Sequence, residues 1–269
     1  RVIARTDNGG PAAARNAGLA AARGEYIAFL DADDEWLPHK LEKQVRALAA
    51  NPSASLCCCD DIWYFPDGTE TIGSDSRDPA NSGRLAWKAL LARSIMSTPM
   101  IMCRRRDALS VGSFDESLVV GQDQDYWIRL ARLGEVIWVP EPLTRVYKRT
   151  EGHMARNVVR AADCFLPMIR RHVAQYRDEL SAKERRSILG QRSAQIGRNL
   201  CVNGHWLRGT GLVLKGVLAG YDPWRQLYFV ARHSPVGRAV DACLRAMCAL
   251  VRGTVAVPAG PGPSEGASP

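Results

Sequence analysis

The amino-acid sequence predicts an α/β protein, in which a mixed β-sheet is flanked by helices and followed by a C-terminal helical region. Two observations favour this class. Over roughly the first half of the 269-residue chain, short apolar runs rich in aromatic and β-branched residues alternate with helical patterns. After residue 155 the strand-like runs stop, and long helical patterns of mixed charge begin. Alternating strands and helices are typical of sheets that bind ligands at the carboxyl ends of their strands.

The early elements have clear local signals. Pro11 suits the first turn of a helix, and Gly24 follows the end of the same helical pattern. A second helix ends at Asn51-Pro52, because the residue before a proline disfavours helical backbone. Its expected apolar face consists of Leu37, Leu41, Val45 and Leu48. In chain order we expect a strand at 2–4, a helix at 12–22, a strand at 26–30, a helix at 37–50 and a strand at 55–65.

Shorter elements are expected between residues 67 and 147. Residues 67–84 are polar and rich in turn formers, which predicts a loop. A helix ending at Gly134 has its apolar residues at helical spacing. Pro140-Glu141-Pro142 separates the last two expected strands. The remaining predictions are helices at 85–92, 105–111 and 121–134, and strands at 98–104, 136–139 and 144–147.

The last part of the chain predicts helices and then a tail. Residues 155–218 are largely helical in pattern, and Tyr221-Asp222-Pro223 interrupts them. Residues 236–251 form a basic amphipathic pattern, and the final Pro/Gly/Ser-rich residues lack the apolar content needed for a core. We therefore expect an α/β domain at 1–155, a helical region at 156–255 and a disordered tail at 256–269.

Composition limits the function classes. Apolar residues make up 46% and charged residues 24%, as in ordinary soluble proteins, and the net charge of +8 suggests an anionic ligand or surface. The chain has no long Lys/Arg block interleaved with aromatic residues, so nucleic acid is not the expected partner. The eight cysteines contain no Cys-x-x-Cys pair, which indicates neither a zinc site nor a disulfide framework. A reducing, cytoplasmic compartment fits these free thiols.

An acidic cluster directly follows the expected strand at 26–30. Asp31, Asp33 and Asp34 stand within four positions, and such close like charges repel unless a cation or donors lie between them. Carboxylate oxygens suit Mg²⁺ or Mn²⁺. Acidic residues before a helix can equally cap its free N–H groups, and this alternative holds also for Glu35. Asp123 and Asp125 at the start of the helix at 121–134 allow the same two interpretations, a cap or a general base.

Several short motifs occur together in one order. They are Asn8-x-Gly10, Ala14-Arg15-Asn16-x-Gly18, the whole segment 24–34, Gly112-x-Phe114-Asp115-Glu116 and Gln122-Asp123-x-Asp125-x-Trp127-x-Arg129-Leu130. Each motif is weak alone, and the ordered set is much more specific. With this set, over residues 1–155, the chain resembles the family 2 glycosyltransferases, which have the Rossmann-like GT-A fold.

The resemblance implies inverting, metal-dependent transfer of a sugar from a nucleotide-diphosphate donor to an acceptor hydroxyl. It makes Asp33 the expected metal ligand for Mg²⁺ or Mn²⁺ and places Asp31 beside the donor ribose. Asp123 matches the catalytic base of the family. Asp125 and Trp127 are then expected on the acceptor side, or in a structural role.

The resemblance also implies donor contacts and shows departures. Arg15, Asn16, Lys148 and Arg149 match donor-side positions. Thr150 stands where a His is common in relatives, and His153 follows, so a His metal ligand is in doubt. Gln122 stands where the family commonly has Glu. The first strand and the nucleobase pocket of the family would precede Arg1, so we expect a truncated fragment that is inactive as it stands.

Other functions remain open from the sequence. One is a nucleotide-sugar-binding remnant without turnover, and another is a phosphatase of the Asp-x-Asp type. For a transferase, the acceptor would be a glycan or a lipid-linked glycan, as in cell-envelope glycan biosynthesis. The basic segment 234–255 either docks on the α/β domain or makes weak peripheral contact with an anionic membrane. The second alternative would bring a cytoplasmic protein to the inner face of the membrane.

Overall fold

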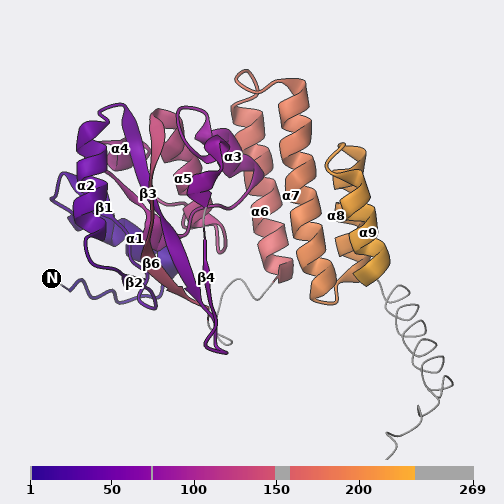
Figure 1. Cartoon of the computed structure of the whole chain (residues 1–269), viewed down its shortest axis with the longest axis horizontal. Helices are drawn as coiled ribbons and strands as arrows, with labels where there is room; N and C mark the ends of the chain where they lie inside the picture. Colours follow the sequence, from indigo (N-terminus) through magenta and orange to yellow (C-terminus); the bar gives the residue numbers. More distant parts are fainter. Residues whose placement is uncertain (1, 74, 149–157, 234–269) are drawn as a thin grey trace, which may run out of the picture.

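The computed structural model describes residues 2–73, 75–148 and 158–233. Within these residues one mixed sheet has the order β1-β5-β3-β6-β2, and β4 pairs with β3 at the side (Figure 1). Strands β3 and β6 are parallel, whereas the other pairs are antiparallel. The strands are β1 Tyr26–Ala28, β2 Glu35–Trp36, β3 Ala54–Tyr64, β4 Glu70–Ile72, β5 Met102–Arg104 and β6 Glu135–Tyr147.

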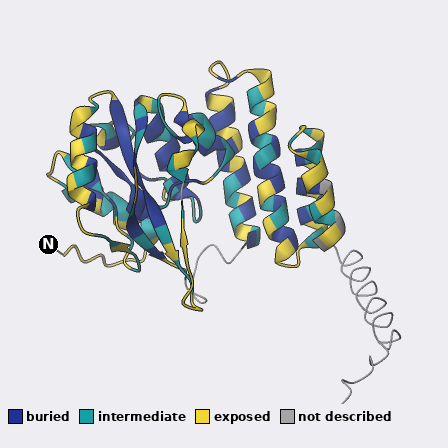
Figure 2. Ribbon diagram, in the orientation of Figure 1, coloured by how far each residue is buried: buried dark blue, intermediate teal, exposed yellow. Residues whose placement is uncertain are grey.

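Helices cover both faces of this sheet, so its central strands are buried (Figure 2). Alternate side chains of β3 point to opposite cores: Leu56 and Cys58 join one apolar cluster, and Cys57 and Cys59 the other. The three consecutive cysteines therefore act as small buried apolar residues, and burial raises their pKa. The helices of this part are α1 Gly10–Ala21, α2 Lys40–Ala50, α3 Ala86–Ala92, α4 Arg105–Ser110 and α5 Gln122–Leu133.

The helical region lies beside the sheet, with its helices roughly side by side in Figure 1. Ile169 and Val173 of the first of them belong to the same core as Trp87 of α3, so this region packs directly on the α/β part. Gly197 and Gly209 let two of the helices approach closely, because a Cβ on Gly197 would lie 2.6 Å from the Gly209 carbonyl oxygen. These helices are α6 Val158–Gln175, α7 Ala182–Val202, α8 Trp206–Leu218 and α9 Pro223–His233.

The expected fold class and most expected elements are confirmed, and two early predictions are wrong. Residues 2–4 are irregular and exposed rather than a strand, since no described strand offers them backbone hydrogen bonds. The helix expected from residue 37 begins at Lys40, because the Leu37 N–H donates to the Leu143 carbonyl and extends the strand pairing of β2. Its buried face is Lys40, Gln44 and Leu48, and Leu41 and Val45 are exposed.

Two later predictions also need correction. The expected strands at 136–139 and 144–147 are one strand, β6, whose prolines fall at a register shift against Cys59 and Asp60 of β3. The expected loop at 67–84 contains β4 and two short 3₁₀ turns, Asp75–Arg77 and Pro79–Asn81. No helix in the described part of the chain is both long and apolar enough to cross a membrane. The segments 234–255 and 256–269 lie outside the described residues.

Candidate active site

An ion pair links α1 to the end of the first strand. Phe29 follows β1 and is anchored among Phe114 and Trp127, with ring centroids 5.6 and 5.1 Å away. The chain then emerges at Asp31, whose Oδ1 lies 2.7 Å from Nη2 of Arg15. The same Arg15 nitrogen donates to Thr98 Oγ1 at 3.1 Å. Buried aromatic packing thus places a guanidinium and a carboxylate together at the strand end.

The other carboxylates of this cluster repel one another. Burial raises the pKa of Asp34 to about 6, and the negative charges of Asp33 and Asp31 add to the rise. The Tyr147 backbone N–H, which donates to Asp34 Oδ1 at 3.2 Å, acts in the opposite direction. A cation bound here would relieve this repulsion. Within the described residues, however, no three His, Cys, Asp or Glu side chains are grouped so that they alone could hold a metal ion.

The capping interpretation of Asp34 and Glu35 is wrong. Helix α2 begins after His39, which has a left-handed φ of 67° and supplies no side-chain cap. Glu35 lies in β2 instead, where its carboxylate pairs with Arg145 at 3.1 Å. Sheet pairing at 35–37 moved the helix start beyond the acidic cluster.

Asp123 stands in the first turn of α5, where the charges of Arg15 and Asp31 at the end of the first strand act on it. Burial raises the pKa of Asp123, and the positive charge of Arg15 and the Gln124 N–H oppose the rise. The charge of Asp31 adds to it, so the three side chains share one electrostatic environment. Asp123 Oδ1 accepts a hydrogen bond from the Gln124 backbone N–H at 2.7 Å. The structure therefore places Arg15, Asp31 and Asp123 within electrostatic range of one another, although they are far apart in the sequence.

A glycine allows this start of α5. Gly121 precedes the helix with φ of 88°, a left-handed conformation that favours glycine. A Cβ at this position would also lie 3.2 Å from the ring of Phe165 on α6. The backbone turn that presents Asp123 is thus coupled to the packing of the helical region.

Two expected donor contacts have partners inside the fold. Asn16 Oδ1 accepts from the Phe114 N–H at 2.7 Å, and its Nδ2 donates to Glu116 Oε1 at 2.7 Å, so Asn16 holds the turn after residue 112. Lys148 Nζ lies 4.3 Å from the centre of the Trp63 ring. Their contacts with a donor stay predictions. Arg149, Thr150 and His153 lie outside the described residues.

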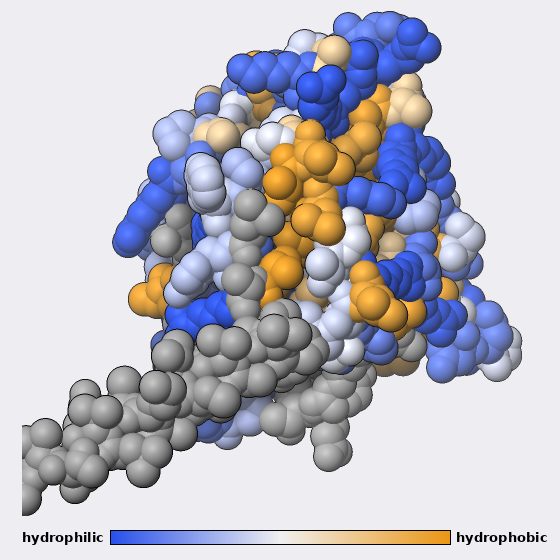
Figure 3. Space-filling view, turned by 90° about the vertical axis from the view of Figure 1, so that its right-hand side faces the viewer, coloured by the Kyte–Doolittle hydropathy of each residue, from blue (hydrophilic) through white to orange (hydrophobic). Residues whose placement is uncertain are grey.

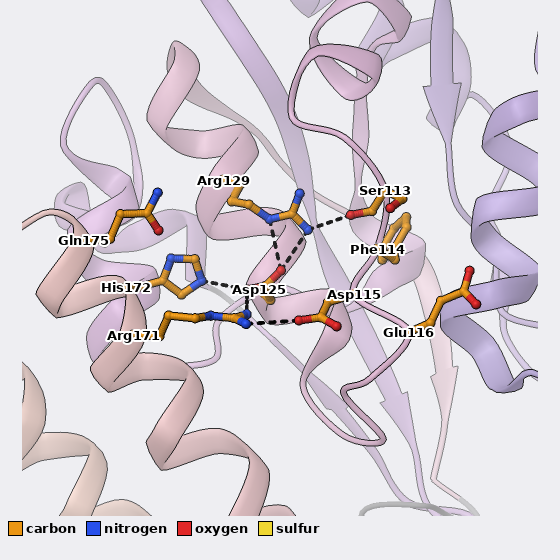
Figure 4. Close-up of a pocket in the computed structure, with 9 residues that line it drawn as sticks. All are labelled: Ser113, Phe114, Asp115, Glu116, Asp125, Arg129, Arg171, His172 and Gln175. Atoms are coloured by element: carbon orange, nitrogen blue, oxygen red, sulfur yellow. Dashed lines mark hydrogen bonds and ion pairs between the residues drawn. The ribbon is translucent and has the colours of Figure 1, made fainter.

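The two residues expected on the acceptor side are buried. Trp127 is fully buried beside Tyr126 and Phe29. Asp125 is 2% exposed and lies between Arg129 of its own helix and the α6 side chains Arg171 and His172 (Figure 4). These contacts tie α5 to α6. The acceptor-side role of both residues stays a prediction.

Burial alone would raise the pKa of Asp125, but the hydrogen bonds hold it low. His172 Nε2 lies 2.8 Å from Oδ1, and Arg129 donates to Oδ2 from Nε at 3.0 Å and from Nη2 at 2.8 Å. Arg171 Nη2 donates to Oδ1 at 2.8 Å. Together they hold the pKa of Asp125 at about 2. The side chain is therefore a carboxylate at neutral pH.

The structure adds features that the sequence analysis did not single out. A groove of about 610 Å³ runs between α1 and β1 and ends at Arg15 and Asp31. Asp61 is buried on β3 and accepts hydrogen bonds from Trp63 Nε1 at 2.7 Å and Ser97 Oγ at 3.2 Å. Two adjacent aspartates inside an expected core strand were the available signal for Asp61. Thr98, the second partner of Arg15, had no such signal.

Comparison with known proteins identifies a family. Residues 1–111 match the model of the family described as Glycosyl transferase family 2. An uncharacterized protein of Mycobacterium tuberculosis, Rv1520, is 30% identical over 205 residues, which cover 68% of this chain and 53% of that protein. The amylovoran biosynthesis glycosyltransferase AmsB of Erwinia amylovora is 28% identical over 143 residues, covering 52% of this chain and 47% of AmsB. The chain spans about half the length of these curated relatives.

A solved structure shows a related fold. The mannosyltransferase PcManGT of Pyrobaculum calidifontis, in complex with GDP-Man and Mn²⁺, has a TM-score of 0.53 and 20% sequence identity with this chain. The match covers 93% of this chain and 63% of that one. It agrees with the expected GT-A architecture, a mixed sheet with flanking helices and a helical region after it.

Proposed function

This chain belongs to glycosyl transferase family 2, and we propose that it transfers a sugar from a nucleoside-diphosphate donor to an acceptor hydroxyl with inversion. One observation carries the proposal. The Arg15 guanidinium and the Asp31 carboxylate are paired at the end of a strand, and both charges act on Asp123 at the start of α5, although the three residues come from three separate elements. A carboxylate whose pKa is raised, here Asp123, is suited to accept a proton, and the nearby Arg15 cation is suited to a negatively charged ligand.

On the donor side, we propose that Asp33 binds a divalent cation and that Asp31 contacts the ribose. The chain's own residues fit such an ion. Burial is the main cause of the raised pKa of Asp34, and the negative charges of Asp33 and Asp31 add a part that a cation would offset. A single carboxylate such as Asp33 is enough in principle, because Mg²⁺ is often bound by one or two carboxylates together with the phosphate oxygens of a substrate. When bound, the ion would stabilise negative charge on the leaving diphosphate.

Arg15 is the proposed donor contact with the most support. Its Nη2 is occupied by Asp31 and Thr98, whereas Nη1 is buried with no hydrogen-bond partner among the described residues. A buried N–H without a partner costs free energy, which a bound ribose or phosphate oxygen could recover. Lys148 and Arg149 would add positive charge near the diphosphate.

For the transfer step, we propose that Asp123 acts as the general base. Its carboxylate accepts the proton of the acceptor hydroxyl while that oxygen forms a bond to C1 of the sugar. The bond between C1 and the diphosphate oxygen breaks at the same time, and its electron pair leaves with the nucleoside diphosphate. Attack from the face opposite the leaving group inverts the configuration at C1. Asp125 and Trp127 support the start of α5 or the acceptor side.

The acceptor is proposed to be a glycan or a lipid-linked glycan in cell-envelope assembly, handled in the cytoplasm. The name of the relative AmsB, an amylovoran biosynthesis glycosyltransferase, supports a polysaccharide acceptor.

Nucleotide binding and turnover test the two halves of the proposal. Binding of GDP and UDP is measured by calorimetry with and without MnCl₂, and release of nucleoside diphosphate from GDP-mannose and UDP-glucose is measured with Mn²⁺. Asp33→Ala should weaken Mn²⁺-dependent binding at least about tenfold, the size of a lost charge-assisted contact. Asp123→Asn should keep binding and lose turnover about a hundredfold or more, as expected for a general base.

Asp178→Asn is the matched control, because Asp178 is an exposed aspartate between α6 and α7. Equal turnover in Asp123→Asn and the unaltered chain would reject Asp123 as the base. Tight binding without any turnover in the unaltered chain would support a nucleotide-sugar-binding protein instead.

A further inference from the structure

Helices α8 and α9 carry large apolar side chains that face solvent. On α8, Leu207 is 96% exposed and Leu218 is 84% exposed, with Leu214 between them on the same helical stripe. On α9, Trp224 is 82% exposed and Tyr228, one turn later, is 63% exposed. We call these five residues the α8–α9 face. Figure 3 views the molecule from this side and shows hydrophobic side chains gathered among hydrophilic ones.

The opposite side of α8 explains why this face is not a packing surface for the described part of the chain. Leu212 and Val213 are buried, and the glycine contacts between Gly197 and Gly209 bring α8 tightly onto α7. The helix is therefore already anchored by its inner side. Its outer leucines contribute little to packing within the described part of the chain. Clusters of large exposed apolar side chains commonly mark a surface that binds a partner or a membrane.

The two helices that carry the face have more basic than acidic side chains. Between residues 206 and 233 the basic residues are Arg208, Lys215, Arg225 and Arg232, whereas Asp222 is the only acidic residue. Arg208 pairs with Asp163 of α6, and Arg232 Nη1 donates to the hydroxyl of Tyr228 at 3.2 Å. Lys215 and Arg225 are exposed. Exposed leucines combined with Trp, Tyr and basic side chains are typical of protein surfaces that lie in a membrane interface.

We infer that the α8–α9 face binds the surface of an anionic phospholipid bilayer. Leu207, Leu218 and Trp224 would enter the boundary between headgroups and acyl chains, and Lys215 and Arg225 would pair with lipid phosphates. A second copy of this chain fits less well, because a symmetric contact would bring two positively charged faces together. The inference does not depend on the proposed transferase activity.

Vesicle sedimentation with the full chain tests the inference. The expected result is binding to vesicles of equal phosphatidylglycerol and phosphatidylcholine, little binding to pure phosphatidylcholine, and weakening by salt. Leu207→Glu with Leu218→Glu should weaken binding about tenfold or more, since each buried leucine contributes strongly to partition. Lys215→Glu with Arg225→Glu should abolish the preference for anionic vesicles.

The matched control is Ile72→Glu with Leu109→Glu, two exposed apolar residues on β4 and α4, outside this face. Circular dichroism and urea denaturation show whether each variant is folded. The inference fails if the Leu207/Leu218 variant binds vesicles like the unaltered chain. It also fails if the unaltered chain binds no vesicles, or forms a dimer that this variant dissociates.

Discussion

Replacing Asp125 by Asn should destabilise the junction between α5 and α6. Asp125 is 2% exposed, and its two carboxylate oxygens accept hydrogen bonds from Arg129 and Arg171 and interact with His172. Asn keeps the shape but loses the charge, and its amide NH₂ group would face donors rather than acceptors. Both arginines would then lose the carboxylate that they share, which is itself buried.

The pKa of Asp125 sets the magnitude. A fall from 3.8 to about 2 corresponds to about 2–3 kcal/mol of additional stability when the carboxylate is ionised. Removing one partner of a buried charge cluster typically costs about 3–5 kcal/mol, so we expect a loss of about 2–4 kcal/mol at pH 7. The folded-state pKa lies below the unfolded one. This contribution is therefore complete above about pH 4 and is lost as the pH falls towards 2.

Urea denaturation followed by tryptophan fluorescence at pH 7, 5, 4 and 3 measures the difference between the variant and the unaltered chain. It should be constant from pH 7 to 5 and shrink below about pH 4. Asp115→Asn is the control, because Asp115 also accepts from Arg171 at 3.1 Å but is partly exposed, and it should cost less than about 1 kcal/mol. A loss below about 0.5 kcal/mol for Asp125→Asn, or one that does not change down to pH 3, would refute the reasoning.

Two further predictions concern buried cations that have no carboxylate partner among the described residues. Arg192 donates to the Leu91 carbonyl at 2.7 Å near the end of α3. Arg192→Met should therefore lower the free energy of unfolding by about 2–3 kcal/mol, measured by urea denaturation. Arg186→Met is the control because Arg186 is exposed, and equal stability of the two variants would contradict the prediction. Burial lowers the pKa of Lys40 from 10.5 to about 8. Between these two pH values the unfolded state therefore binds more protons than the folded state. The free energy of unfolding should rise by about 3 kcal/mol as the pH rises through this range. Lys40→Met should lack this gain in the free energy of unfolding, whereas the buried cysteines contribute to the pH dependence of both proteins. If the free energies of unfolding of Lys40→Met and the unaltered chain run parallel from pH 8 to 10.5, the prediction is wrong.

Local patterns predicted most of the elements because periodicity, glycine and proline act over a few residues. They failed where pairing with a distant strand overrode local preference. Residues 35–37 had acidic and apolar side chains suited to a helix start, yet pairing of β2 with β6 keeps them extended. The same limit explains Leu41 and Val45, since the buried side of α2 depends on which sheet face it covers.

The candidate site was predicted in parts by residue type. The acidic cluster after β1 and the carboxylate at the start of α5 were both visible in the sequence. Their relation was not, because it depends on Arg15 of α1 reaching Asp31 and on the turn at Gly121. Thr98, Asp61 and the α6 partners of Asp125 lie far away in the chain and carry no motif.

By itself the sequence determined the α/β class, the family resemblance and the residue types available for chemistry, since these follow from local patterns and ordered motifs. Only the tertiary structure decided which carboxylates share one environment and which are used for packing. Asp123 lies within electrostatic range of Asp31 and Arg15, whereas Asp125, two residues later on the same helix, is paired with side chains of α6. Successive residues on a helix point about 100° apart, so side chains two residues apart point in nearly opposite directions. This is why Asp123 is a candidate base, whereas Asp125 forms ion pairs that join α5 to α6.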